Sequence, residues 1–419
     1  MKIRLVLIGL TAACAPLIPE PPRGGPAQAA QPTAAAATAT AAVQPVPYED
    51  QSFEGWKQGF LARHGGANRA AFERELAGLS PDPSVIRLDG NQPEFSRPVG
   101  AYVQNAVSAQ RIAEGRDRLM SAPVAAEQRY GVPREILVGI WAQESAFGQV
   151  QGDHDVIRSL ATLAHDGRRR DWAEEQLKEA LTIIVEGRAP RSRLKGSWAG
   201  AMGQSQFMPD NYRRLAVDGD GDGVVDIWNS PADAMSAANL LNNAGWKRDQ
   251  RWHYEVTLPR GFDYALAEGE RQPWSYWAQR GVVLSRGGAP STAEQAEGAT
   301  ILLPQGANGP AFLALPNHYI IRRYNNSVAY ALAIGMTADG IAGRPGLVAA
   351  WPDEAPLSRD QRLGAQRALA AAGFDPGGVD GIVGSGTRRA LRGWQQANGL
   401  TPDGHLTAAL ADRLIAEQR

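Results

Sequence analysis

The chain has 419 residues, of which 43% are hydrophobic and 21% are charged, and this composition is typical of a globular protein with two or three domains. Its 43 Lys and Arg residues are balanced by 44 Asp and Glu residues, so no overall positive field would attract nucleic acid or an anionic membrane. The single cysteine, Cys14, excludes an internal disulfide, and the six histidines have no spacing typical of a zinc site.

The first 14 residues have the pattern of an export signal. Lys2 and Arg4 precede an apolar run that is shorter than the about 20 residues of a membrane helix, and small residues follow as far as Cys14. The stretch from Leu10 to Cys14 resembles a bacterial lipobox, although its leucine stands one place farther from the cysteine than usual. We expect a periplasmic lipoprotein, anchored to the outer membrane through lipidated Cys14. The alternative is a plain secretory signal with an incidental cysteine.

Composition divides the rest of the chain into three parts. Residues 15–50 are rich in Ala, Pro and Thr and predict a disordered tether. Residues 51–351 have the pattern of one folded domain, which is mostly helical. Residues 357–416 form a compact unit with three amphipathic helical patterns.

Strand-like segments interrupt the helical pattern of the large domain. We expect strands within residues 254–259, 300–304 and 319–321, because these short β-prone runs are separated by Gly and Pro. A helix is expected to begin near Ser327. The prediction is therefore a mainly α domain with a small β insertion.

One glutamate lies on the apolar face of a predicted helix that begins near Pro133. Leu137, Ile140 and Trp141 precede Glu144 by seven, four and three residues, so helical spacing places its carboxyl on the same face. Desolvation there would raise its pKa, as an acid that holds its proton near neutral pH requires. The alternative is a solvated glutamate at a helix end.

Three segments in the same order and spacing resemble the lytic murein transglycosylase B family, glycoside hydrolase family 103. Residues 138–148 resemble its catalytic helix, residues 196–209 its cleft-lining motif and residues 323–331 its second wall. The resemblance covers about residues 53–346 and implies a lysozyme-like helical fold. It implies substrate contacts at Ser197, Gln204, Gln206, Tyr324, Asn325 and Tyr330. The family can carry an aromatic residue where this chain has Leu240, so one stacking contact is expected to be missing.

The resemblance also implies a mechanism with one carboxyl group, whereas glycosidic cleavage usually uses two. Glu144 would protonate the leaving oxygen of the MurNAc–GlcNAc linkage, and the 2-acetamido group of the substrate would stabilise the cationic centre. Glu144 would then take the proton of the MurNAc C6 hydroxyl. The product is a 1,6-anhydro ring, formed without water and without a cofactor for the chemistry. Two alternatives are a hydrolytic muramidase of similar fold and a non-catalytic peptidoglycan-anchoring protein.

An acidic loop follows the second of these segments and resembles an EF-hand. Its candidate ligands at positions one, three, five, seven and nine are Asp218, Asp220, Asp222, Val224 through its carbonyl, and Asp226. Position twelve is Asn229 instead of glutamate, and a longer loop in the family favours Asp233 as the closing ligand. We expect structural Ca²⁺, with Na⁺ as the other candidate; the alternative is an acidic surface turn.

The C-terminal unit resembles a peptidoglycan-binding domain of the three-helix type. Asp380-Gly381 and Asp403-Gly404 are turn signals between its helical patterns. We expect its small core to consist of Leu369, Ile382, Leu391, Trp394 and Leu400. The expected partner is the peptidoglycan glycan strand, bound by a monomer.

Overall fold

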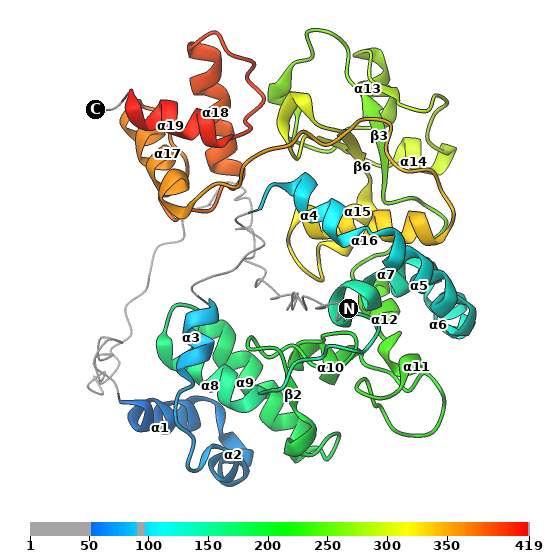
Figure 1. Ribbon diagram of the computed structural model, residues 1–419. Coiled ribbons are helices and arrows are strands. Elements are labelled where there is room, and N and C mark those ends of the chain that lie inside the picture. The colour runs from blue at the N-terminus through cyan, green and yellow to red at the C-terminus, as the bar shows by residue number, and fades with distance from the viewer. Residues whose placement is uncertain (1–51, 90–96, 418–419) are drawn as a thin grey trace, which may run out of the picture.

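The computed structural model describes residues 52–89 and 97–417, which are mostly helical (Figure 1). The predicted export signal, Cys14 and the predicted tether lie outside these residues. The mainly α fold class is confirmed, with separate hydrophobic cores in the helical part, the β insertion and the C-terminal unit. Within the described part of the chain, no helix is long and apolar enough to cross a membrane.

Two buried helices form the centre of the helical part. Helix α7 (Arg134–Ser145) is buried from Ile136 to Ser145, and helix α16 (Val328–Ile341) packs against it. Gly139 permits the close approach, because a Cβ at this position would lie 3.0 Å from the carbonyl oxygen of Ile334. Helix α16 begins where the sequence predicts, with the Ser327 side chain accepting a hydrogen bond from the Tyr330 amide. The packing leaves the polar side chains near the end of α7 inside the protein.

Other helices lie around this pair (Figure 1). Those before residue 190 are α1 (Phe53–His64), α2 (Arg69–Leu76), α3 (Pro83–Asp89), α4 (Val99–Ala106), α5 (Ala109–Ser121), α6 (Val124–Tyr130), α8 (Val156–Asp166) and α9 (Arg170–Val185). Helix α1 is fixed to α9 by the buried carboxylate of Glu174, which accepts from Trp56 Nε1 at 2.9 Å and from Arg63 at 2.7 Å. The N-terminal helices therefore belong to the same packed unit.

A short antiparallel pair, β1 (His154–Asp155) and β2 (Lys195–Gly196), introduces the segment that reaches α7 from the other side. His154 lies opposite Gly196 in this pair. Three short helices follow, namely α10 (Pro209–Leu215), α11 (Pro231–Ala234) and α12 (Ala237–Asn243). The segment between β2 and α10 has little regular structure, so tertiary contacts determine its shape.

The β insertion is an antiparallel sheet with the strand order β4-β3-β6-β5. Its elements are β3 (His253–Thr257), β4 (Val283–Leu284), β5 (Thr300–Leu302) and β6 (Ala311–Ala314), with the short helices α13 (Trp274–Gln279) and α14 (Thr292–Ala296). The strands expected within residues 254–259 and 300–304 are confirmed in shorter form. The strand expected at 319–321 is wrong, because Pro316 at the first helical position starts α15 (Pro316–Ile321) instead.

The C-terminal unit consists of α17 (Arg359–Ala371), α18 (Ser385–Ala397) and α19 (Ala408–Ala416), which confirms the three-helix type. Its core contains Leu369, Leu391 and Trp394, but the expected core residue Ile382 is 48% exposed. Ile382 follows the Asp380-Gly381 turn and precedes α18, so no helical face carries it inward.

The C-terminal unit contacts the β insertion directly (Figure 1). Glu268 of the insertion forms ion pairs of 2.8 Å with both Arg388 and Arg392 of α18. The carboxylate of Asp403 accepts a hydrogen bond of 2.9 Å from the Ala307 amide. These partly buried contacts hold the C-terminal unit against the β insertion.

The packing of α16 gives a direct test of this architecture. A Cβ at Gly335 would lie 2.1 Å from the Trp252 indole. Overpacking costs about 1–3 kcal/mol, which exceeds the ~0.5–1 kcal/mol that alanine gains over glycine in a helix. We expect Gly335→Ala to lower the melting temperature measured by circular dichroism.

Gly346→Ala is the control, because a Cβ at this position would have no atom within 4 Å. Its melting temperature should be unchanged or slightly higher. A melting temperature of Gly335→Ala equal to that of the wild type would contradict the described packing.

Candidate active site

The carboxyl group of Glu144 lies in the interior, with 3% of the residue exposed. The hydroxyl of Tyr330 donates a short hydrogen bond to Glu144 Oε1, and Oε2 has no partner among the described residues. Burial raises the pKa of Glu144 to about 8, and the Tyr330 hydrogen bond opposes part of this shift. The group is therefore a carboxylic acid that stays largely protonated at neutral pH.

The chain turns sharply directly after Glu144. Ala146, Phe147 and Gly148 adopt successive positive φ angles of 47°, 59° and 85°. The Ser145 hydroxyl donates to the Gln204 carbonyl at 2.6 Å and accepts from the Gly148 amide at 2.9 Å. Such backbone strain in non-glycine residues persists only where surrounding contacts hold it, and it is frequent at functional sites. The turn fixes the end of α7 against the segment from 196 to 208.

That segment contains three of the residues expected to contact substrate. Ser197 is buried, and its Oγ accepts from the amides of Ala199 at 3.3 Å and Ala201 at 3.0 Å. The hydroxyl thus organises a tight loop. Ser197 lies in the motif that was expected to line the cleft, but the two hydrogen bonds that it accepts come from backbone amides of its own loop.

The side chains of the two glutamines in this segment form hydrogen bonds that stabilise the fold. Gln204 Oε1 accepts from Trp141 Nε1 at 3.0 Å, and its Nε2 donates to the Trp228 carbonyl at 3.2 Å. Gln206 has a positive φ of 50°, and its Nε2 donates to the Gly203 carbonyl at 2.8 Å. Both side chains connect the segment to its neighbours, and Gln204 connects it to α7 itself.

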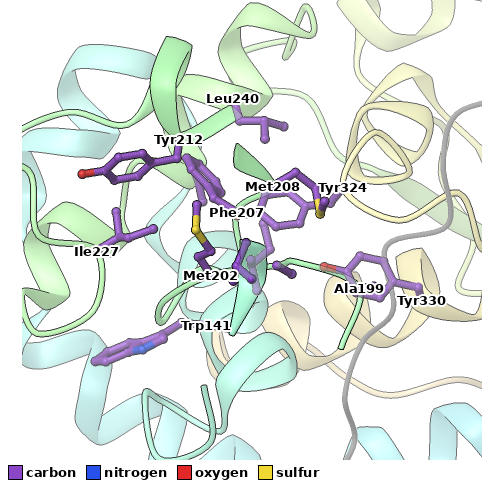
Figure 2. Close-up of a cluster of buried hydrophobic side chains, with 14 of the residues drawn as sticks. Trp141, Ala199, Met202, Phe207, Met208, Tyr212, Ile227, Leu240, Tyr324 and Tyr330 are labelled. Carbon is purple, nitrogen blue, oxygen red and sulfur yellow. The ribbon is translucent and has the colours of Figure 1, made fainter. Parts of the chain in front are cut away.

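Tyr324 of the second expected wall lies beside Phe207 and Met208 of the segment (Figure 2). The Tyr324 hydroxyl donates to the Ser205 carbonyl at 2.9 Å, and its ring lies 6.0 Å from that of Phe207. Asn325 is also buried, and its carbonyl accepts from the Ser327 amide at the start of α16. Leu240 belongs to the same buried cluster, where it packs as a core residue.

A set of hydrogen-bonded side chains next to Glu144, formed by Gln143, Tyr102 and Arg111, was not predicted from the sequence. Gln143 is buried, its Nε2 donates to the Tyr102 hydroxyl at 3.1 Å, and its Oε1 accepts from Arg111 at 3.3 Å. The available signal was a second polar residue at the end of an apolar helix. The contact connects α7 to α4 and α5, which supports the position of Glu144.

The acidic loop brings three of its predicted ligands together. The carboxylates of Asp218, Asp220 and Asp222 offer oxygens within 4.8 Å of one another. Asp226 instead forms an ion pair of 2.8 Å with Arg193. Asp233 is buried, and its carboxylate accepts from the amides of Gly219 and Asp226 at 2.7 and 2.5 Å. Val224 lies on the loop and is 52% exposed.

The geometry fits a loop that holds a cation. Three adjacent carboxylates repel one another unless a positive charge lies between them, and oxygen ligands suit Ca²⁺. Asp233 closes the loop through hydrogen bonds from two backbone amides, and the cluster of adjacent carboxylate oxygens consists of Asp218, Asp220 and Asp222 without it. The chain directly after Asp226 contacts the segment from 196 to 208, because the Gln204 backbone amide donates to the Ile227 carbonyl at 2.9 Å.

Comparison with known proteins identifies the family. Residues 52–339 match the transglycosylase SLT domain family. The chain belongs to this family. Residues 358–414 match a peptidoglycan binding domain family. The chain is 32% identical over 292 residues to membrane-bound lytic murein transglycosylase B of Escherichia coli K12, which covers 66% of this chain and 79% of the relative.

Solved structures of lytic transglycosylases agree with this assignment. SltB3 from Pseudomonas aeruginosa, in complex with NAG-anhNAM-pentapeptide, is 48% identical with a TM-score of 0.80 and covers 87% of this chain and 99% of its own. Slt35 from Escherichia coli, in complex with calcium, is 29% identical with a TM-score of 0.58 and covers 68% and 92%. The lysozyme-like fold expected for this lytic transglycosylase is confirmed.

The raised pKa of Glu144 makes the stability of the enzyme depend on pH. Between about 4.5, the ordinary value, and about 8, the folded state binds a proton that the unfolded state has released, so this group destabilises the fold increasingly as pH rises. Glu144→Gln removes the effect. We expect its advantage in melting temperature over the wild type to be smallest near pH 4 and to grow up to about pH 8.

A constant difference in melting temperature across this range would contradict the pKa assigned to Glu144. Glu135→Gln removes a carboxyl group from the first turn of the same helix, outside its buried stretch, and is the matched control. Its difference from the wild type should not grow over the same range.

Proposed function

We propose that this lytic transglycosylase cleaves the MurNAc–GlcNAc bond of peptidoglycan with Glu144 as its single acid and base, and leaves 1,6-anhydroMurNAc ends. The observation that carries the proposal is the burial of the Glu144 carboxyl group in contact with the Tyr330 hydroxyl. Within the described part of the chain, no charged group contributes to the shift of its pKa. A second catalytic carboxylate beside it would do so, which supports the one-carboxyl mechanism.

The hydrogen bonds of Glu144 suggest how one group serves both steps. Tyr330 holds Oε1, so Oε2 remains to meet the glycosidic oxygen. Protonated Glu144 gives its proton to that oxygen as the bond to the MurNAc C1 breaks, and the substrate 2-acetamido group stabilises the positive centre. The resulting carboxylate keeps the Tyr330 hydrogen bond and accepts the proton of the C6 hydroxyl as this oxygen attacks C1. The acid is regenerated without water.

The two walls around Glu144 support binding of a glycan strand. We propose that Ser197, Gln206, Tyr324 and Asn325 line the path of the strand, with Tyr330 at the reacting bond. The amide of Gln204 is engaged by Trp141 and Trp228, so its proposed role is to hold the wall against α7. A relative, SltB3, was solved in complex with NAG-NAM-pentapeptide, which supports binding of a peptidoglycan fragment by this chain.

The flanking parts of the chain suggest where the reaction takes place. We propose that the C-terminal unit binds peptidoglycan and that the enzyme works in the periplasm, anchored to the outer membrane through lipidated Cys14. The match of residues 358–414 to a peptidoglycan binding domain family supports the first statement. The lipobox-like sequence and the membrane-bound relative support the second.

Replacement of the proposed acid tests the mechanism. Glu144→Gln keeps the size of the side chain but can neither supply nor accept the proton. General acid–base catalysis contributes about 10²–10⁴-fold, so release of 1,6-anhydro-muropeptides, measured by mass spectrometry, should fall at least that far. Sedimentation with insoluble peptidoglycan should be unchanged.

Two results would contradict this mechanism. Near-normal turnover by Glu144→Gln would require another acid. Products with a reducing MurNAc end, heavier by one water, would identify a hydrolytic muramidase.

We also propose that the loop from Asp218 to Asp233 binds Ca²⁺ in a structural role. A bound cation stabilises the folded state in proportion to the logarithm of its concentration over its dissociation constant. Chelation should therefore lower the melting temperature of the wild type, and Asp222→Ala should abolish the difference between chelated and calcium-loaded protein. Slt35, the relative solved with calcium, supports the proposal.

Asp263→Ala is the control, because Asp263 lies outside the loop and is exposed. Its melting temperature should keep the full response to the chelator. Restoration by Na⁺ at millimolar concentration would identify sodium instead, and no response of the wild type to chelation would leave the loop as an acidic turn.

A further inference from the structure

A cavity of about 720 Å³ lies on the side of α16 opposite Glu144. Tyr330 and Asp339 are nine residues apart, about two and a half helical turns, so their side chains leave α16 on opposite faces. Tyr330 contacts Glu144, whereas Asp339 lines the cavity. No residue proposed above for catalysis or glycan binding lines it. The cavity is therefore separate from the cleft.

Three parts of the fold enclose the cavity. Helices α4, α5 and α16 line one side, and strands β3 and β4 of the insertion line another. Residues 344–351, which lead toward the C-terminal unit, complete the wall. Its volume falls in the range of about 300–1,000 Å³ that is usual for small-ligand sites.

Specific contacts hold this last segment in place. The carboxylate of Glu255 on β3 accepts hydrogen bonds of 2.7 Å from the amides of Val348 and Ala349. Arg286 donates to the Gly346 carbonyl at 2.7 Å. The wall is thus formed before any ligand arrives.

The charge of the lining favours an anion. Four arginines and two acids line the cavity, namely Arg116, Arg251, Arg286, Arg344, Asp339 and Glu255. Asp339 pairs with Arg251 and Arg344, at 3.4 and 2.6 Å. Arg116 and Arg286 donate to backbone carbonyls, and within residues 52–89 and 97–417 neither forms an ion pair with a carboxylate. Two positive charges therefore remain for a ligand.

The rest of the lining favours a ligand with apolar groups and amides. Apolar side chains come from Val103, Val107, Ile112, Leu284, Met336 and Trp351. His253 lines the cavity, is 5% exposed, and its Nδ1 has no hydrogen-bond partner among the described residues. Arg251 Nε is also buried without a partner there. A short peptide that ends in a carboxylate offers apolar side chains to the apolar lining, amides to the polar atoms without partners, and a negative charge to the arginines.

We propose that this cavity binds the peptide stem of peptidoglycan, with a stem carboxylate held by Arg116 and Arg286. The inference rests on the proposed function only in that peptidoglycan is the substrate, and it does not depend on the role of Glu144. The stem is the short peptide, rich in free carboxylates and small side chains, that the substrate itself carries. The cavity would then recognise stems while the cleft on the other face of α16 holds the glycan.

Calorimetry with a sugar-free stem pentapeptide tests the proposal in the full-length Glu144→Gln protein. We expect binding to this peptide and weaker binding to the same peptide with every carboxylate amidated. Arg116→Gln and Arg286→Gln should each reduce affinity by about 10-fold to 100-fold, the usual effect of losing a hydrogen bond to a charged group. Arg260→Gln removes the same charge from an exposed position outside the cavity and should leave the affinity unchanged.

Three results would overturn the proposal. The first is equal affinity for the free and the amidated peptide, and the second is equal affinity of the Arg116→Gln, Arg286→Gln and Arg260→Gln proteins. The third is equal binding of an unrelated apolar peptide of L-residues with a free carboxylate, which would remove the assignment to the wall. Because binding is measured in a protein without the proposed acid, a failure of the catalytic proposal gives a different result, namely turnover by Glu144→Gln.

Discussion

The structure depends on the burial of one carboxyl group at the contact between two helices. Removing Glu144 from water raises its pKa to about 8, and the cost is tolerated because Tyr330 gives the group one hydrogen bond. This state requires that α7 is surrounded on every side and that α16 approaches it closely at Gly139. The central packing of the enzyme therefore determines the protonation state of its proposed acid.

The surrounding segments hold that arrangement from two directions. Gln204 and Ser145 connect the segment after β2 to the end of α7, and the strained turn at Ala146 and Phe147 lies between them. Gln143 connects the same helix to α4 and α5. Buried polar groups are costly unless they are paired, so these hydrogen bonds specify one geometry for the residues around Glu144.

Helix α16 connects the cleft to the rest of the molecule. One face presents Tyr330 to Glu144, and the other lines the cavity enclosed by the β insertion and the segment that leads to the C-terminal unit. The insertion in turn holds that unit through Glu268. The C-terminal unit, the cavity and the proposed acid are thus connected through a continuous set of packed elements.

The sequence by itself determined the class of the fold, the three-helix C-terminal unit and the candidate acid, because helical periodicity and local motifs are short-range properties. It did not determine that Tyr319 to Ile321 is helical, since a short apolar run is compatible with strand and helix until Pro316 and its neighbours pack. It also placed Ile382 in the core, although a turn carries it outward. Only the tertiary structure paired Tyr330 with Glu144 across 186 residues and directed the amide of Gln204 toward Trp141, because such contacts depend on how distant helices pack.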